Sequence, residues 1–267
     1  MEYTTLGNTT VTIPEVGLGT WKYKGGVAPL RRGIELGAVL IDTAEMYRTE
    51  DVVGQAIEGI RETIFLATKV SGEHLRHDAV LRAADDSLRR LGTDVIDLYQ
   101  IHWPNPRVPI RETMQAMETL VQRGQVRYIG VSNFSLAELR AAQAAMTNYP
   151  IVANQVLYSL HRREIERELL PYCQQQQITI LAYTPLDDGR LAKKPLLGAR
   201  NKIKTLAQIA TEVHKTMAQV ALRWCTSRPN VIVIPKSDRV DRTEENCRAS
   251  GWSLTPAQMQ QLDAAFA

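Results

Sequence analysis

Residues 63–70 have the sequence TIFLATKV, a nearly continuous run of apolar side chains that ends next to a lysine. A strand that is covered on both faces has this composition, because neither set of its alternating side chains meets water. Residues 95–102, VIDLYQIH, have the same character and end at a histidine. Both segments therefore predict strands that are buried on both sides.

Runs of this kind recur along the chain at residues 15–20, 39–44, 63–70, 95–102, 126–132, 151–156, 178–184 and 231–237. Amphipathic segments of helical period lie between them, among them 78–91, 110–124, 135–147 and 161–177. This alternation predicts a parallel (β/α)8 barrel, and 267 residues is an ordinary length for one. The alternative is a doubly wound open sheet, but the sequence has no glycine fingerprint after its first strand.

The ends of the predicted elements carry further signals. Asp78, Ser135 and Thr255 are the expected N-caps of three helices. Residues 2–13 have a turn sequence, Leu6-Gly7-Asn8, between two short β-prone segments. We expect an N-terminal β-hairpin that closes the bottom of the barrel, and a single domain over residues 1–267.

The composition limits the possible functions. Hydrophobic residues make up 44% and charged residues 23% of the chain, and the net charge is only +3. Most of the chain shows no gathering of basic residues, so we expect no nucleic-acid partner. The amino terminus does not resemble a signal peptide, and no apolar run is long enough to span a membrane. We therefore expect a soluble, cytoplasmic protein.

The three cysteines, Cys173, Cys225 and Cys247, are widely spaced and odd in number. This pattern fits neither a disulfide framework nor a zinc site. We expect free thiols that are buried or half-buried in a reducing compartment, and no bound metal.

Polar residues stand where several of the predicted strands end. Asp42, Lys69 and His102 end strands 2, 3 and 4, and Tyr47 follows in the loop after strand 2. Taken singly, each has a structural explanation as a helix cap, a surface lysine, a core histidine or a packed ring. In a barrel, however, these strand ends meet at one face, where active sites lie. Further polar residues follow the later strands at Asn133, Gln155, Tyr183 and Lys236.

The four residues at the earlier strand ends form a proton-transfer set. A Lys69 ammonium should lower the pKa of Tyr47 from its ordinary value of about 10. Asp42 would keep Lys69 charged, and Tyr47 could then donate a proton to a carbonyl oxygen that His102 orients. No Ser-His-Asp arrangement is evident, which disfavours acyl transfer. Trp21, Tyr23 and Trp103 add aromatic side chains and predict an apolar pocket.

Eight motifs in this order closely resemble the aldo-keto reductase family, in particular bacterial and archaeal carbonyl reductases similar to 2,5-diketo-D-gluconate reductase. They are GLGTW (17–21), DTAEMYRTEDVVG (42–54), LATKV (66–70), DLYQIHWP (97–104), VRYIGVSNF (126–134), NQVLY (154–158), AYTPL (182–186) and IPKSDRVDRTEEN (234–246). Together they cover nearly the whole chain. The resemblance implies an NADPH-dependent reductase that converts aldehydes or ketones to alcohols.

The resemblance also implies roles for single residues. Asp42, Tyr47, Lys69 and His102 match the catalytic tetrad, with Tyr47 as general acid and hydride transfer from C4 of the nicotinamide. The residues that match the cofactor site are Ser132, Asn133 and Gln155 for the carboxamide, Tyr183 for stacking on the nicotinamide, Thr184, Pro185 and Leu186 in the following loop, Lys236, Ser237, Arg239 and Arg242 around the 2′-phosphate, and Glu245 and Asn246 for the adenine. The basic residues follow strand 8, where barrels commonly bind phosphate.

Two departures from the family pattern stand out. Arg48 occupies a position where related bacterial sequences often have glycine, and we expect an effect confined to the pocket rim. Asp187 and Asp188 lie close to the expected pyrophosphate, which they would repel unless they are paired or turned outward. Gly189 and Arg190 could turn this loop and supply a compensating charge.

Two other functions remain open at this stage. Lys69 could be the Schiff-base lysine of a barrel aldolase. Alternatively, the chain could be a cofactor-bound regulatory protein with little turnover. We expect the protein to be a monomer that acts on a small-molecule carbonyl substrate.

Overall fold

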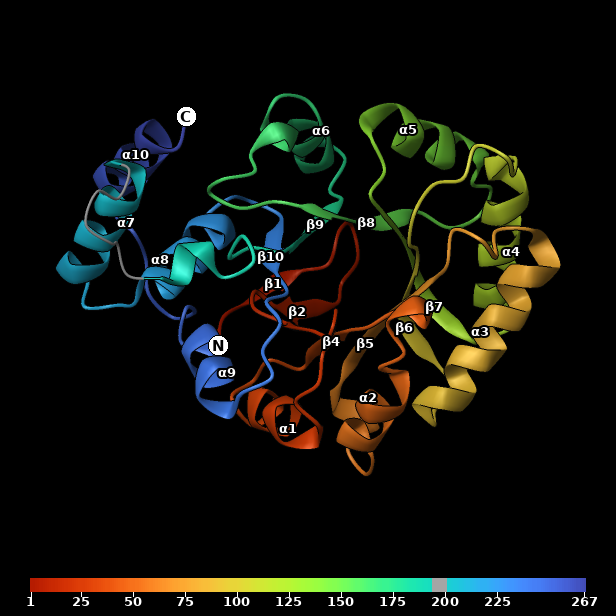
Figure 1. The fold of residues 1–267 in the computed structure, drawn as a ribbon. Helices are drawn as coiled ribbons and strands as arrows, with labels where there is room; N and C mark the ends of the chain where they lie inside the picture. The colour runs from red at the N-terminus through yellow and green to blue at the C-terminus, as the bar shows by residue number, and fades with distance from the viewer. Residues whose placement is uncertain (194–200) are drawn as a thin grey trace.

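The computed structural model describes residues 1–193 and 201–267. Eight parallel strands pair in consecutive order, and Figure 1 shows the helices around the outside of this sheet. The (β/α)8 prediction is confirmed. The strands are β3 (Leu18–Gly19), β4 (Leu40–Asp42), β5 (Phe65–Val70), β6 (Ile96–Ile101), β7 (Val126–Ser132), β8 (Ile151–Leu157), β9 (Thr179–Tyr183) and β10 (Val231–Val233).

Helices follow the strands as the periodicity predicts, with one exception. They are α1 (Val27–Glu35), α2 (Glu50–Ile57), α3 (His77–Leu91), α4 (Ile110–Gln122), α5 (Leu136–Ala145), α6 (Leu169–Gln175), α7 (Asn201–Glu212), α8 (Met217–Thr226), α9 (Val240–Cys247) and α10 (Pro256–Ala265). The segment predicted as one helix over 161–177 is instead a 3₁₀ turn at Glu164–Glu166 followed by α6. Ser159 and Arg162 exchange two backbone hydrogen bonds in a tight turn, so the first two residues of the predicted helix belong to this turn.

The barrel closes at a seam between its first and last strands. Isolated parallel bridges join Val16 to Val233 and Gly19 to Lys236. A Cβ atom on Gly19 would lie 2.5 Å from the backbone oxygen of Ile234, so only glycine permits this approach. β3 is shorter than the predicted strand over 15–20, because Val16 pairs only through an isolated bridge.

The predicted N-terminal hairpin is present as β1 (Tyr3–Thr5) and β2 (Thr12–Pro14), paired antiparallel. Leu6 and Ile13 are fully buried and pack against apolar side chains that line the barrel, including Leu40 and Phe65 at the starts of their strands. The hairpin thus plugs the amino-terminal end of the barrel. The polar residues lie at the opposite end, where the Trp21 and Trp103 side chains are exposed.

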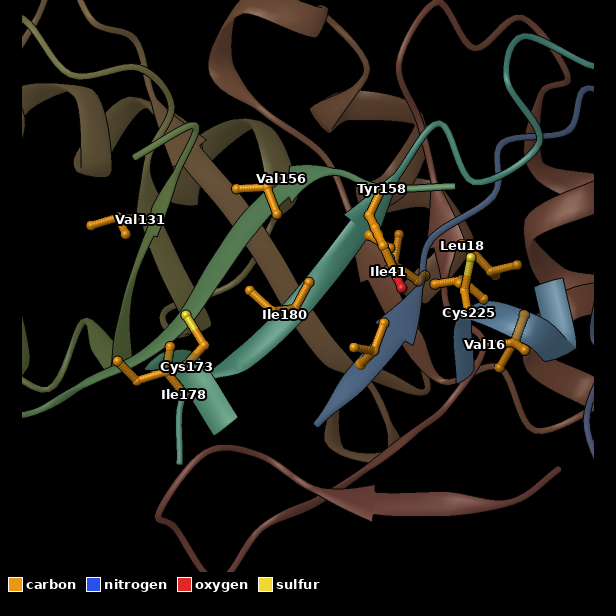
Figure 2. Packing of buried hydrophobic residues seen from close by; sticks show 14 of the residues in the cluster. Val16, Leu18, Ile41, Val131, Val156, Tyr158, Cys173, Ile178, Ile180 and Cys225 are labelled. Carbon is orange, nitrogen blue, oxygen red and sulfur yellow. The ribbon is translucent and has the colours of Figure 1, made fainter. Parts of the chain in front are cut away.

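A second apolar layer fills the space between the strands and the surrounding helices. Figure 2 shows Cys173 beside Ile178 in this layer. All three cysteines are buried and free, and burial raises the pKa of the Cys173 thiol to about 12 and that of Cys247 to about 11. The thiols therefore stay protonated at neutral pH. None of the helices in the described part of the chain is long and apolar enough to cross a membrane.

Two of the three predicted caps are confirmed. Ser135 and Thr255 each form a capping box with the residue three positions later. The prediction for Asp78 is wrong, because α3 already begins at His77. The backbone N–H of His77 donates to the Glu112 carboxylate from α4, so a neighbouring helix supplies the cap that the local sequence lacks.

Candidate active site

The strand register brings Asp42 and Lys69 together inside the open end of the barrel. The Lys69 ammonium donates to Asp42 Oδ2 at 2.6 Å and to the backbone oxygen of Thr43 at 2.8 Å. Both charged side chains are buried, and that of Lys69 has no exposed surface. Burial lowers the pKa of Lys69, and the Asp42 carboxylate opposes this effect. The Asp42 carboxylate therefore favours the charged form of Lys69, which burial alone disfavours.

Tyr47 and His102 complete the predicted tetrad. Tyr47 ends the 3₁₀ turn Glu45–Tyr47 after β4, and its ring centroid lies 4.8 Å from Lys69 Nζ. Its hydroxyl is 3.4 Å from His102 Nε2. The Tyr47 ring also contacts Trp21, with centroids 4.8 Å apart. The four residues therefore meet in one place, with two polar atoms facing the same point at the mouth.

The expected lowering of the Tyr47 pKa is wrong. Burial, together with the negative charge of Asp42, raises the pKa of Tyr47 well above 10. The reason is geometric, because Lys69 Nζ is bound to Asp42 and Thr43 and lies over the ring rather than at the hydroxyl. Tyr47 is consequently a neutral O–H donor at neutral pH, which is the state a general acid requires.

His102 is also neutral at neutral pH. Burial, assisted by the charge of Lys69, lowers the pKa of His102 to about 3. Its Nδ1 atom is buried and has no partner among the described residues. The tautomer with the proton on Nε2 leaves only an acceptor unpaired, and unpaired buried acceptors are better tolerated than donors. This tautomer directs an N–H toward the Tyr47 hydroxyl and the mouth.

The geometry does not favour a Schiff-base role for Lys69. An amine that attacks a substrate carbonyl must reach it, whereas the Lys69 side chain is fully buried beneath the Tyr47 ring. Its ammonium also has two oxygen partners inside the barrel. Among the residues placed by the structure, no group of three His, Cys, Asp or Glu side chains is arranged to hold a metal ion.

Asn133 links two walls of the site. Its Nδ2 donates to the backbone oxygen of His102 at 3.0 Å, and its Oδ1 accepts from the Tyr183 hydroxyl at 2.8 Å. The Ser132 hydroxyl donates to the backbone oxygen of Gln155. Asn133 has a positive φ of 62°, which turns its amide across the mouth after β7. The three residues expected at the carboxamide thus lie together at the end of β7, directly after it, and on β8.

Sequence reasoning missed Gln100, a fully buried residue of β6. Its Nε2 donates to Asp42 Oδ1 at 3.3 Å, and Gln155 Nε2 donates to the same oxygen at 2.7 Å. A signal was present, because Gln100 lies two residues before His102 and so points to the same side of the strand.

The loop after β9 resolves the expected clash of acids. Asp187 is buried and bound to the His161 ring at 2.8 Å, with Arg190 at 3.5 Å, while Asp188 is exposed. Gly189 turns the chain with a φ of 80°. Of the residues expected at the cofactor, Tyr183 and Thr184 are half-buried, Pro185 is buried, and Leu186 packs against the core.

The basic cluster after β10 is already paired with acids from its own segment. Lys236 binds Asp238, Arg239 binds Asp241, and Arg242 binds Glu245. The Ser237 hydroxyl donates to the backbone oxygen of Arg239, and Asn246 is buried. A phosphate group at this place would have to exchange with these carboxylates for the same cations.

The aromatic residues expected in the pocket fall into two groups. Trp21 and Trp103 are 48% and 49% exposed, so their rings form an accessible rim. Tyr23 belongs instead to the packed core, and its hydroxyl donates to the backbone oxygen of Gly26 at 2.7 Å. Burial raises the pKa of Tyr23 to about 12. Its hydroxyl is therefore committed within the protein.

The chain matches the aldo/keto reductase family over residues 15–267. It is 40% identical over 266 residues to methylglyoxal reductase YeaE of Escherichia coli, a match that covers 96% of this chain and 92% of that protein. It is 36% identical over 260 residues to glyoxal reductase of Bacillus subtilis, covering 95% of this chain and 89% of that protein.

Solved structures agree with this match. The thermostable aldo-keto reductase Tm1743 superposes with a TM-score of 0.92 at 40% identity, over 99% of this chain and 100% of that chain. An aldo/keto reductase from Klebsiella pneumoniae, solved with NADP and acetate, superposes with a TM-score of 0.90 at 38% identity, over 100% of this chain and 96% of that chain. The chain belongs to the aldo/keto reductase family of oxidoreductases.

The backbone explains why glycine suits the position that Arg48 occupies. Arg48 follows Tyr47 with a φ of 56° and a ψ of 37°, the left-handed conformation, and its side chain is exposed. This conformation costs a residue with a Cβ atom about 1–2 kcal/mol, a penalty that glycine avoids. The arginine therefore strains the turn that presents Tyr47.

We predict that Arg48→Gly raises the free energy of unfolding by about 1 kcal/mol, since the released strain exceeds the entropy that glycine adds to the unfolded chain. Arg48→Ala is the matched control, because it removes the same side chain but keeps the Cβ atom. Urea denaturation of both variants would measure the difference. Equal stabilisation by alanine would show that the side chain, not the backbone, is responsible.

Proposed function

We propose that this protein reduces aldehydes and ketones to alcohols with NADPH, and that Tyr47 donates the proton. The observation that carries the proposal is the convergence of the Tyr47 hydroxyl and His102 Nε2, 3.4 Å apart, above the buried Lys69–Asp42 pair. The family match and the names of the relatives support reduction of carbonyl groups. A tetrad assembled in full favours turnover over a purely regulatory role.

The residues at the mouth suit a phosphorylated dinucleotide. Ser132, Asn133 and Gln155 offer hydroxyl and amide groups beside the Tyr183 ring, and Asn133 and Gln155 carry the polar atoms that a carboxamide requires. Three cations follow β10 at a place where barrels commonly bind phosphate. When bound, the reduced nicotinamide supplies the hydride, and the protein supplies orientation and electrostatics. The NADP and NADPH complexes of aldo-keto reductase from Klebsiella pneumoniae support this cofactor.

The chain's own residues then handle the substrate oxygen. Tyr47, held neutral by burial, donates its proton as negative charge develops on that oxygen. Neutral His102 donates a hydrogen bond to the same atom and fixes its direction. After the proton transfer Tyr47 is a phenolate, and the nearby Lys69 ammonium stabilises its negative charge. Because this charge develops only as the proton leaves, the stabilisation favours the transition state over the bound substrate.

We propose small aldehydes as the substrate class. The exposed Trp21 and Trp103 rings offer apolar contact at the rim, and two relatives are named for methylglyoxal and glyoxal reduction. We further propose that the protein acts as a monomer in the cytoplasm. All four tetrad residues come from one chain, and three buried free thiols suit a reducing compartment.

Tyr47→Phe should lower kcat for methylglyoxal reduction by about 100- to 10,000-fold, because it removes only the transferred proton. The affinity for NADPH, measured by fluorescence titration, should stay within about threefold of the wild type. Tyr172→Phe is the matched control, since its hydroxyl bonds to Gln143 on the outer helices and not to the site. A Tyr47→Phe enzyme with most of its turnover would rule out Tyr47 as the proton donor.

Arg242→Ala should weaken NADPH binding by about tenfold or more and leave NADH binding unchanged, because a charge-assisted contact contributes roughly 1.5–3 kcal/mol. Arg248→Ala serves as the control, as Arg248 ends the same helix region and pairs with Glu244 instead. Fluorescence titration with NADPH and with NADH gives the ratio of the two dissociation constants for each variant. An unchanged preference in Arg242→Ala would remove Arg242 from the phosphate site.

A further inference from the structure

Gln100 occupies the inner layer of the barrel directly beneath the site. In the sheet, Gln100 of β6 lies opposite Lys69 of β5 and opposite Gly130 of β7. A Cβ atom on residue 130 would lie 3.0 Å from the Gln100 Cγ atom, so the glycine leaves room for the glutamine side chain. Gln100 has no exposed surface. The barrel thus buries a polar amide at this position, although burying an amide carries a desolvation penalty that an apolar side chain would avoid.

The contacts of Gln100 converge on one carboxylate. Asp42 Oδ1 accepts from Gln100 Nε2 at 3.3 Å and from Gln155 Nε2 at 2.7 Å, while Oδ2 accepts from Lys69. Gln100 Oε1 also accepts from Gln155 Nε2 at 3.4 Å. Both oxygens of the buried carboxylate are therefore engaged by donors inside the barrel.

The chemistry of a carboxylate fixes the direction of both amides. An ionised Asp42 only accepts hydrogen bonds, so Gln100 and Gln155 must both present NH₂ groups to it. Gln155 Oε1 then faces away from Asp42. The two amides thus occupy Oδ1 of the carboxylate, and the carboxylate in turn orients Gln155.

We propose that Gln100 is a positioning residue for the reduction: together with Gln155 it holds the Asp42 carboxylate in the orientation that fixes Lys69 over the Tyr47 ring. It acts through Asp42 and does not touch the substrate. The inference rests on the proposed function, because it assigns Gln100 a role in presenting the proton donor.

Two substitutions separate this role from simple packing. Gln100→Leu keeps the approximate size and removes both polar atoms, so kcat should fall about tenfold at every pH. Gln100→Glu is nearly isosteric and places a second acid at Asp42 Oδ1. When both acids are ionised they repel, and one of the two carboxyl groups takes up a proton more readily than usual. The introduced carboxyl group, once protonated, donates to Asp42 as the amide does.

The ratio of Gln100→Glu kcat to wild-type kcat should therefore rise several-fold as the pH falls from about 8 to about 5.5, while the ratio for Gln100→Leu stays flat. The binding of NADPH by each variant, followed by fluorescence, should change less than about threefold. Circular dichroism at each pH confirms that the variant compared is folded. The pH dependence of the Gln100→Glu ratio does not use the Gln100→Leu variant, so it still tests the proposal if Gln100→Leu does not fold.

Wild-type kcat in both variants at every pH would overturn the proposal, and so would a Gln100→Glu defect that does not change with pH. Tyr47→Phe is measured alongside them. If Tyr47→Phe keeps its turnover, the proposed function fails first. If Tyr47→Phe is inactive and the Gln100 variants behave like the wild type, only the role of Gln100 fails.

Discussion

The site depends on the buried contact between Lys69 and Asp42. Taking two charges out of water carries a desolvation penalty that their attraction offsets only with good geometry and further hydrogen bonds. The structure provides both, through the 2.6 Å contact and through Thr43, Gln100 and Gln155. A pair of packed apolar side chains could stabilise the barrel equally well. The pair is therefore better explained by the chemistry it enables than by stability.

The rest of the fold positions this pair beneath Tyr47 and His102 at one end of the barrel. The N-terminal hairpin plugs the other end of the barrel, and the glycine seam at Gly19 closes the wall beside the site. Burial then sets the protonation states of the two groups above the pair. Tyr47 and His102 are both neutral at neutral pH, because each is removed from water and neither has a counter-ion of its own. One group can give a proton, and the other can hold the acceptor.

The sequence predicted the barrel, and the end of it at which Asp42, Tyr47, Lys69 and His102 meet, because both rest on local patterns. Buried strands are apolar runs, and active residues in a barrel follow those runs, so Asp42, Lys69 and His102 could be located from their positions alone. The failures concern contacts between distant segments. The cap on α3 comes from Glu112 on α4, and Tyr23 packs into the apolar core instead of lining the pocket. The sign of the Tyr47 pKa shift depends on where the Lys69 ammonium lies, which spacing does not reveal. Gln100 lies within a strand, not at its end, and its partner Asp42 is distant in the sequence, so the pattern of strand ends did not include it.

The most direct test compares Lys69→Met with the double variant Asp42→Asn/Lys69→Met. The single variant leaves a buried carboxylate without its cation and should lose about 3–5 kcal/mol of unfolding free energy, whereas the double variant should recover most of that loss. If the Lys69–Asp42 pair is required for catalysis, the double variant recovers stability but not turnover. Both variants should then reduce methylglyoxal at least about 100-fold more slowly than the wild type. A double variant that recovers stability and reduces methylglyoxal at close to the wild-type rate would contradict the account.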